Sequence, residues 1–254
     1  MKNLIFFGTS EIAAPNLRAI LKSRKLKVAA AVVAKNEKCA VAKIARAENL
    51  PLFCDDLNLQ FAEKMREFKP AIFAVVDFGK FLPNEILAIP KFGAFNLHPS
   101  LLPKFRGPTP VQSAILAGEK KSGFSIFKIG EKMDAGEIFF REEIEIANLR
   151  AEEVYEKILK IAAPKFCEIL EKIAAGEIST GEKQNEKLAT FCGKIEKSHG
   201  EIFPQKETAE EILRKINAFF PWPSAFLNSE KFGFLKILRG KKIPVNSGLK
   251  PAVH

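Results

Sequence analysis

The first 34 residues of the chain read MKNLIFFGTSEIAAPNLRAILKSRKLKVAAAVVA. Residues 4–7 form a short apolar run that ends at Gly8, which predicts a strand followed by a tight loop. Residues 11–22 have the spacing of an amphipathic helix, and the Val/Ala run over residues 28–34 predicts a second, buried strand. This order of elements is typical of two parallel strands joined by a crossover helix.

The same alternation continues along the first half of the chain. The further predicted elements are helices over residues 41–48 and 61–68 and strands over residues 71–76, 94–98, 125–129 and 138–144. Continuous apolar strands separated by helices indicate a parallel sheet that helices cover on both faces. The last two strands follow each other without a helix between them. We therefore expect an α/β fold with a doubly wound, mostly parallel sheet and an antiparallel far edge.

Three parts are expected along the chain. Residues 1–175 form the sheet domain, which ends in a helix over residues 151–175 that Pro164 kinks or breaks. Residues 176–206 are polar and irregular, which predicts a linker. Residues 207–254 carry a helix and two short strands, which indicate the start of a C-terminal β domain. Two strands alone make no stable domain, so we expect this domain to be incomplete.

Composition excludes several classes of protein. With 254 residues, 47% of them hydrophobic and 28% charged, the chain can bury a large core, which excludes a disordered chain. The apolar run over residues 28–34 is far shorter than the roughly 20 residues that a membrane helix needs, and the N-terminus lacks a signal-peptide pattern. The four cysteines form no CxxC pair and the three histidines are scattered. We therefore expect a reduced, cytoplasmic protein with no metal and no membrane segment.

The chain is strongly basic. Forty Lys and Arg residues against 30 Asp and Glu residues give a net charge of +10, and the isoelectric point is about 9.4. Residues 18–27 hold five basic residues and no acidic one, and residues 231–254 hold six basic residues and no acidic one. Such clusters favour a polyanionic partner. Solvated faces of a lysine-rich protein explain the same composition equally well.

The loop at residues 8–10 argues against nucleotide cofactors. It reads GTS, with Glu11 directly behind it, whereas a dinucleotide-binding fold needs GxGxxG at this position. No GxxxxGK[ST] sequence occurs in the chain, so the phosphate-binding loop of nucleoside triphosphatases is absent. We therefore expect neither a dinucleotide nor a nucleoside triphosphate in this loop.

The densest unusual segment is NLHPSLLPKFRGPTP, residues 96–110. Asn96 and His98 are two positions apart, so they lie on one face of a strand, at its carboxyl end, where ligands bind in open α/β sheets. An amide donor beside an imidazole suits chemistry in which a carbonyl oxygen becomes negative and a proton moves. A histidine that merely packs at the strand end is the ordinary alternative. The four prolines that follow His98 favour the functional interpretation, because they indicate a rigid exposed loop.

A second candidate is Asp134, in the loop GEKMDAGEI at residues 130–138. A lone aspartate in a Gly-flanked loop is usually a turn residue. Paired with His98, it can instead orient the imidazole and stabilise its protonated form. Neither GxSxG nor a cysteine-nucleophile signature occurs, so we expect the substrate to supply the nucleophile. The pattern indicates group transfer between two bound molecules.

NLHPSLLP at residues 96–103, followed by MDAG at residues 133–136, resembles the signature of the folate-dependent formyltransferases. Residues 6–10, 105–115 and 219–226 further resemble the branch of that family that acts on methionyl-tRNA, and the resemblance covers nearly the whole chain. It implies a formyltransferase-like, Rossmann-type fold. It also implies that the chain transfers a formyl group from 10-formyltetrahydrofolate to the amino group of initiator methionyl-tRNA, without a metal. We expect a monomer.

The resemblance also implies roles for individual residues. By matched position, Asn96, His98 and Asp134 are expected to be catalytic. Two segments are expected to contact the folate, one of them on the pterin side. The first comprises Ser100, Leu101, Leu102 and Pro103, and the pterin-side loop comprises Phe78, Gly79, Lys80, Phe81, Leu82 and Pro83.

Two departures from the methionyl-tRNA branch concern the tRNA. That branch carries a long basic loop after the second strand that contacts the tRNA acceptor end, whereas here residues 33–40 lead almost directly into a helix. It also ends in a β-barrel of the oligonucleotide-binding type, of which residues 207–254 resemble only the first strands.

Both departures favour an alternative within the family, an N-formyltransferase that acts on a sugar-nucleotide amine. A basic RNA-binding module whose site has decayed is a third hypothesis, against which the intact Asn96, His98 and Asp134 argue. We expect the tRNA substrate, because the segment that follows NLHPSLLP fits that branch well and the basic tail supplies charge for phosphates.

Overall fold

The computed structural model describes residues 1–34, 38–229 and 231–241. Within these residues a seven-stranded sheet has the order β3-β2-β1-β4-β5-β6-β7. The first five strands in this order pair in parallel, whereas β6 runs antiparallel to both β5 and β7. The prediction of a doubly wound, mostly parallel sheet with an antiparallel edge is confirmed. The strands are β1 (Lys2–Gly8), β2 (Leu26–Val32), β3 (Leu52–Phe53), β4 (Ile72–Val76), β5 (Ala94–His98), β6 (Lys121–Lys128) and β7 (Ile138–Glu145).

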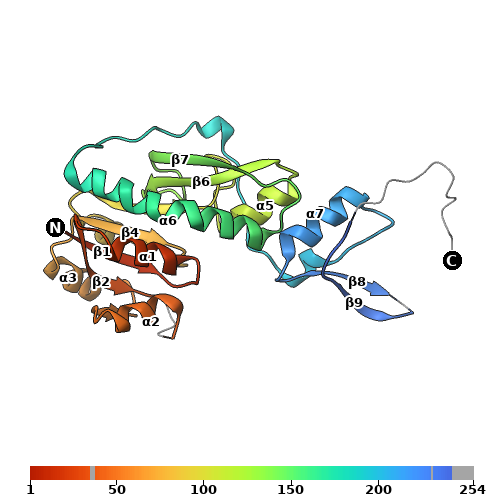
Figure 1. Cartoon of the computed structure of the whole chain (residues 1–254), viewed down its shortest axis with the longest axis horizontal. Coiled ribbons are helices and arrows are strands. Elements are labelled where there is room, and N and C mark those ends of the chain that lie inside the picture. The colour runs from red at the N-terminus through yellow and green to blue at the C-terminus, as the bar shows by residue number, and fades with distance from the viewer. Residues whose placement is uncertain (35–37, 230, 242–254) are drawn as a thin grey trace.

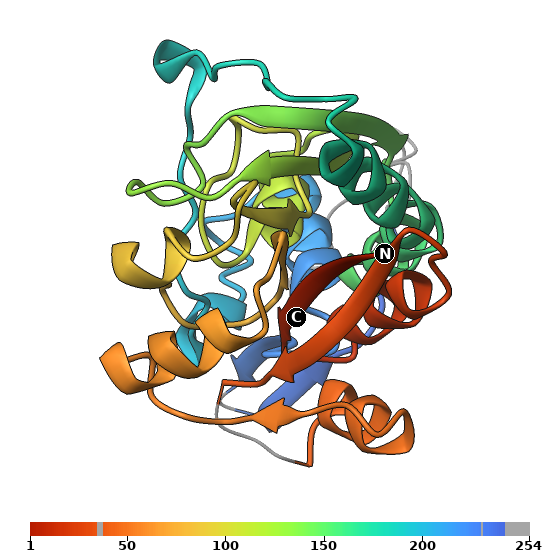
Figure 2. The same cartoon turned by 90° about the vertical axis from the view of Figure 1, so that its left-hand side faces the viewer.

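Helices cover both faces of this sheet (Figure 2). One face carries α1 (Ala13–Leu21), α2 (Ala40–Ala47), α5 (Pro110–Leu116) and α6 (Ala151–Ala175), and the other carries α3 (Leu59–Glu67) and α4 (Asn84–Leu87). Alternating side chains of β1 supply both hydrophobic cores. Leu4 and Phe6 pack with the first set of helices, and Ile5 and Phe7 pack with the second. The strand is an unbroken apolar run because both of its faces are buried.

Several elements differ from the sequence prediction. Helix α6 is continuous through Pro164, so the predicted break is absent, and a kink there stays a prediction. Its buried face, which includes Ala162 and Phe166, packs on the sheet, and this burial offsets the backbone hydrogen bond that a proline removes. Strand β3 and helices α4 and α5 were not predicted. Helix α5 starts with Pro110 at its first turn, where proline is favoured, although the Pro-rich sequence around it indicated only a loop.

The chain beyond α6 returns to the sheet domain. Glu182 forms a bridge with Ile138 of β7, and Phe191 forms a bridge with Arg106 in the loop that precedes α5. The elements that follow are η1 (Glu186–Leu188), η2 (Lys197–Gly200), α7 (Ala209–Phe219) and the antiparallel hairpin of β8 (Ala225–Ser229) and β9 (Gly233–Ile237). Helix α7 contacts α5, and the hairpin lies to the right of the sheet in Figure 1. The division into sheet domain, linker and C-terminal β domain stays a prediction.

Some sequence features lie only partly within the described residues. Of the short connection at residues 33–40, positions 35–37 lie outside them, and so do residues 242–254 of the basic tail. Helix α2 begins directly after Cys39, whose Sγ accepts a hydrogen bond from the Ala42 amide at 3.5 Å. All four cysteines are free thiols. Over the described part of the chain, every helix is too short or too polar to cross a membrane.

Candidate active site

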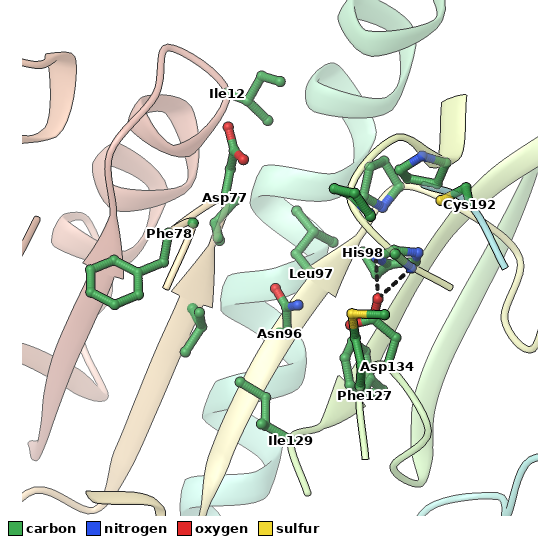
Figure 3. A pocket seen from close by; sticks show the side chains of 18 of the residues that line it. Ile12, Asp77, Phe78, Asn96, Leu97, His98, Phe127, Ile129, Asp134 and Cys192 are labelled. Atoms are coloured by element: carbon green, nitrogen blue, oxygen red, sulfur yellow. Dashed lines mark hydrogen bonds and ion pairs between the residues drawn. The ribbon is translucent and has the colours of Figure 1, made fainter. Parts of the chain in front are cut away.

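A cavity with a volume of about 620 Å³ opens at the carboxyl ends of β4 and β5. The loop after β1, the loop between β6 and β7, and one face of α6 complete its walls. Open α/β sheets bind ligands at this edge, where the strand order changes direction. Asn96, His98 and Asp134 all line the cavity (Figure 3). The structure thus brings the three predicted catalytic side chains together.

Asn96 occupies the floor of the cavity. Its amide nitrogen lies on the side of His98 and Asp134, and its amide oxygen lies on the opposite side (Figure 3). The oxygen Oδ1 is buried and has no hydrogen-bond partner among the described residues. An unpartnered buried polar atom costs free energy, and in a native protein such an atom calls for a functional explanation. A bound substrate with an N–H or O–H group would satisfy it.

The hydrogen bond of His98 to the main chain fixes which ring nitrogen carries the hydrogen in the neutral form. The side chain is 4% exposed, and its Nε2 lies 2.9 Å from the backbone carbonyl oxygen of Phe105. Because a carbonyl oxygen only accepts hydrogen bonds, Nε2 carries the hydrogen. In the neutral ring, Nδ1 therefore has a free lone pair. This lone pair faces the Asp134 carboxylate, with Nδ1 and Oδ2 3.7 Å apart.

Asp134 is held in an unusual backbone conformation. Its φ angle is +51°, in the left-handed region, which aspartate tolerates better than most residues and which recurs at functional sites. Oδ2 accepts a hydrogen bond from the Gly107 amide at 2.8 Å. Gly107 itself has a φ of +122°, and a Cβ atom there would collide with the Cys192 carbonyl oxygen. Only glycine allows this close approach, so the Gly of the FRGPTP segment positions the carboxylate.

Burial and charge oppose each other at His98. Burial lowers the pKa of His98 from its ordinary value of 6.5, and this effect exceeds the opposing ones of the Asp134 carboxylate and the Phe105 carbonyl, which raise it. The imidazole is therefore neutral at pH 7. A neutral Nδ1 beside a carboxylate is a site that can accept a proton.

We expect the ring signals of His98 in an NMR titration to have a midpoint below pH 6.5. The Asp134→Asn variant keeps an acceptor for Gly107 but loses the negative charge that favours the imidazolium. Its midpoint should therefore lie lower still. The His98→Gln variant assigns the signals. A midpoint that rises in Asp134→Asn would contradict the conclusion that the Asp134 charge raises the pKa of His98.

The two predicted folate segments are placed differently. Phe78, Gly79, Lys80, Phe81 and Leu82 line the cavity, whereas Pro83 does not. The segment from Ser100 to Pro103 also lies outside the cavity lining, and Ser100 and Leu102 are fully buried.

Polar contacts anchor this second segment on β6. The hydroxyl of Ser125 donates to the Ser100 carbonyl at 2.7 Å and accepts from the Leu102 amide at 3.0 Å. In this structure the segment supports the loop that carries Phe105, the partner of His98. Its contact with folate stays a prediction.

Sequence reasoning missed several residues of the cavity wall. Asp77, Tyr155, Cys192 and Lys194 line the cavity, the last two from the segment expected to be a linker. Burial raises the pKa of Tyr155 well above its usual value, and its hydroxyl donates to Gln112 Oε1 at 3.3 Å. None of these residues carries a motif of its own. Asp77 could have been found, because it directly follows a buried strand.

Metal binding finds no support in the described residues, where no three His, Cys, Asp or Glu side chains come together as a metal site requires. The three predicted catalytic side chains that line the cavity, Asn96, His98 and Asp134, are an amide, an imidazole and a carboxylate. This set suits proton transfer and oxyanion stabilisation.

Comparison with known proteins gives consistent results. The formyl transferase family matches residues 1–170. A methionyl-tRNA formyltransferase of Thermodesulfovibrio yellowstonii is 35% identical over 258 aligned residues, which cover 95% of this chain and 82% of that protein. A methionyl-tRNA formyltransferase of Wolbachia is also 35% identical, with 89% of this chain and 77% of that protein covered.

Solved structures show the same fold at lower sequence identity. A 4-N formyltransferase from Francisella tularensis superposes with a TM-score of 0.75 at 19% identity, covering 95% of this chain and 99% of that chain. The sugar 3N-formyl transferase WlaRD, crystallised in the presence of dTDP and 5-N-formyl-THF, has a TM-score of 0.73 at 22% identity, covering 94% of this chain and 85% of that chain. Both similarities support the Rossmann-like architecture expected from the sequence.

Proposed function

This chain belongs to the formyl transferase family, and from that premise we propose that it transfers the formyl group of 10-formyltetrahydrofolate to the amino group of initiator methionyl-tRNA. The observation that carries the proposal is the convergence of Asn96, His98 and Asp134 on one cavity at the carboxyl edge of the sheet. The names of the relatives at 35% identity support methionyl-tRNA as the acceptor.

The first chemical step is the attack of the neutral acceptor amine on the formyl carbon. A C–N bond forms and the formyl oxygen becomes negative. The Asn96 amide N–H, which faces the His98 side of the cavity, donates a hydrogen bond to this oxygen (Figure 3). One well-placed donor of this kind is commonly worth about 3–4 kcal/mol in the transition state.

The proton of the attacking amine goes to the His98–Asp134 pair. Nδ1 of His98 and Oδ2 of Asp134 are both acceptors, so one added proton satisfies both. The resulting imidazolium is stabilised by the Asp134 carboxylate. When the tetrahedral intermediate collapses, the bond between the formyl carbon and folate N10 breaks and N10 takes up the proton. The net change is one formyl group moved to the acceptor and one proton moved to the folate.

The size and lining of the cavity support a folate site beside Asn96. Its volume of about 620 Å³ lies within the usual range of about 300–1,000 Å³ for small-molecule sites. Apolar side chains such as Phe78, Leu82 and Ile129 line it on one side, and the orphaned Oδ1 of Asn96 offers an acceptor for a folate or amine N–H. If both substrates are held in contact at Asn96, their translational and rotational entropy is lost on binding. The activation free energy of the chemical step is then lower.

The second candidate acceptor is a sugar-nucleotide amine, which the sugar formyltransferase structures of the same fold favour. Charge favours the tRNA instead. Lys80, Lys132 and Lys194 line the cavity, and the net charge of the chain is +10. A polyanion with many phosphates uses such charge better than a small nucleotide does. Formylation of methionyl-tRNA takes place where the tRNA is charged, so we propose a cytoplasmic location, and the monomer stays a prediction.

Salt dependence distinguishes the two acceptors. If tRNA binds, the logarithm of its affinity should fall linearly with the logarithm of salt concentration, with a slope of about 0.7–0.9 per phosphate contact. The triple variant Lys231→Gln, Lys236→Gln and Arg239→Gln removes exposed cations near β9 and should flatten this slope without changing folate binding. A sugar nucleotide makes few phosphate contacts. A flat salt response, together with no competition between tRNA and a sugar nucleotide, would favour the second acceptor.

A further inference from the structure

Arg106 is the largest fully buried side chain of the described structure, with 2% of its surface exposed. It lies in the loop between β5 and α5, next to Gly107. Its guanidinium uses both of its edges. Nε and Nη2 donate to Gln184 Oε1 at 3.1 and 2.8 Å, and Nη1 and Nη2 donate to the two carboxylate oxygens of Glu186 at 2.9 and 2.8 Å. Only arginine offers donors in this rigid fork.

Gln184 connects this arginine to the catalytic turn. Its Nε2 donates to the backbone carbonyl oxygens of Asp134 and Gly136, both at 2.8 Å. The amide of Gln184 cannot be turned over, because Arg106 only donates and the two carbonyl oxygens only accept. The amide therefore has one possible orientation, with Oε1 toward Arg106 and Nε2 toward the Asp134 and Gly136 carbonyls.

The turn that carries Asp134 is thus held from two sides by neighbouring residues. The Gly107 amide binds the Asp134 carboxylate directly, at 2.8 Å. The Arg106 side chain reaches the Asp134 backbone through Gln184. Backbone bonds from Arg106 to Thr190 and from Cys192 to Arg106, both 2.8 Å, fix the later segment beside this loop. The left-handed backbone of Asp134, with φ of +51°, is a conformation that persists only when its surroundings determine it.

We propose that Gln184 is a positioning residue for Asp134, oriented by the fork of Arg106 and anchored through Glu186. The segment predicted as a linker would then be a working part of the active site. The role of Asp134 in formyl transfer rests on the proposed function, but the geometric claim does not. A displacement of about 1 Å in a reacting group can cost about 100-fold in rate, so a loosened turn should lower kcat.

The first test is a kinetic double-mutant cycle. Gln184→Ala should lower kcat about 10- to 100-fold and change the KM for the folate by less than about threefold. In an Asp134→Asn background the same substitution should change kcat by less than about twofold, because its effect passes through the carboxylate. Gln184→Glu keeps the acceptor for Arg106 but places a carboxylate against two carbonyl oxygens, and it should be as slow as Gln184→Ala.

The matched control is Glu182→Gln. Glu182 lies two positions away in the same segment, and its side chain pairs with Arg141, whereas that of Gln184 binds the Asp134 and Gly136 carbonyls. It should keep its kcat within about twofold of the wild type. Equal losses for Gln184→Ala in both backgrounds would overturn the proposal, since they would mean a general structural effect.

The second test does not need turnover. The Asp134 carboxylate raises the pKa of His98, so a turn that moves away should lower the midpoint of the His98 ring titration. Gln184→Ala should lower this midpoint, and it should have no effect in the Asp134→Asn background. An unchanged midpoint in Gln184→Ala would overturn the inference. The two proposals can fail separately. If the wild-type protein does not formylate methionyl-tRNA but Gln184→Ala still lowers the His98 midpoint, the proposed acceptor is wrong and the positioning role of Gln184 stands.

Discussion

Replacing His98 or Asp134 with alanine is expected to remove most of the formyl transfer and to leave the protein folded. His98→Ala removes the Nδ1 acceptor for the amine proton, and Asp134→Ala removes the charge that stabilises the imidazolium. A positioned acid–base group typically contributes about 100- to 10,000-fold to a rate. Each variant should therefore lose at least about 100-fold in kcat. Steady-state formyl transfer, measured beside circular dichroism and thermal melting, gives the comparison.

A histidine outside the site is the control for this prediction. His199 lies in η2, and its Nδ1 accepts a hydrogen bond from the Glu196 amide at 3.1 Å, away from the cavity. His199→Ala should keep nearly the wild-type rate. If His98→Ala or Asp134→Ala retained more than about a third of the wild-type rate, the assignment of the proton acceptor would be wrong.

Asn96→Asp should be at least as damaging as Asn96→Ala. The aspartate replaces an amide donor with a negative acceptor at the position where the formyl oxygen becomes negative. Loss of one oxyanion donor commonly costs about 100- to 1,000-fold in rate, and the added charge opposes the transition state further. The measurement is single-turnover formyl transfer at saturating folate, so that binding and chemistry are separated.

The control is Asn49→Asp, at an exposed position with φ of +53°, which aspartate also adopts. It should transfer formyl groups at the wild-type rate. An Asn96→Asp variant clearly faster than Asn96→Ala would contradict the oxyanion role and would indicate that Asn96 mainly accepts a hydrogen bond through Oδ1.

The fold was predictable because its signals are local. Strands β1, β2 and β4 are short apolar runs, and both faces of β1 are buried, which its unbroken hydrophobicity already indicates. The same holds for Asn96 and His98, whose spacing of two along a strand sets them on one face. Strand β3 has only two residues, too few for any periodicity to appear.

The residues that hold the Asp134 turn in place were not predictable from local sequence patterns. Arg106 and Gln184 are 78 positions apart, and the segment around Gln184 is polar and irregular, as an exposed linker would be. Within it, Gln184 meets the buried Arg106 guanidinium and the Asp134 and Gly136 carbonyls, whereas most of its neighbours are exposed. For Ser100 to Pro103 the motif predicts folate contact, the structure places Ser100 and Leu102 fully buried and outside the cavity lining, and the contact stays a prediction.

We propose that the cavity formed around Asn96, His98 and Asp134 moves a formyl group from a reduced folate to charged initiator tRNA. The most direct measurement incubates the protein with 10-formyltetrahydrofolate and initiator methionyl-tRNA, and in parallel with an aminosugar nucleotide, and identifies the products by mass spectrometry. Uncharged tRNA and the His98→Ala variant serve as controls. We expect formylmethionine on the tRNA, with little or no formylated sugar. Formyl transfer to the sugar nucleotide alone, or to neither acceptor, would contradict it.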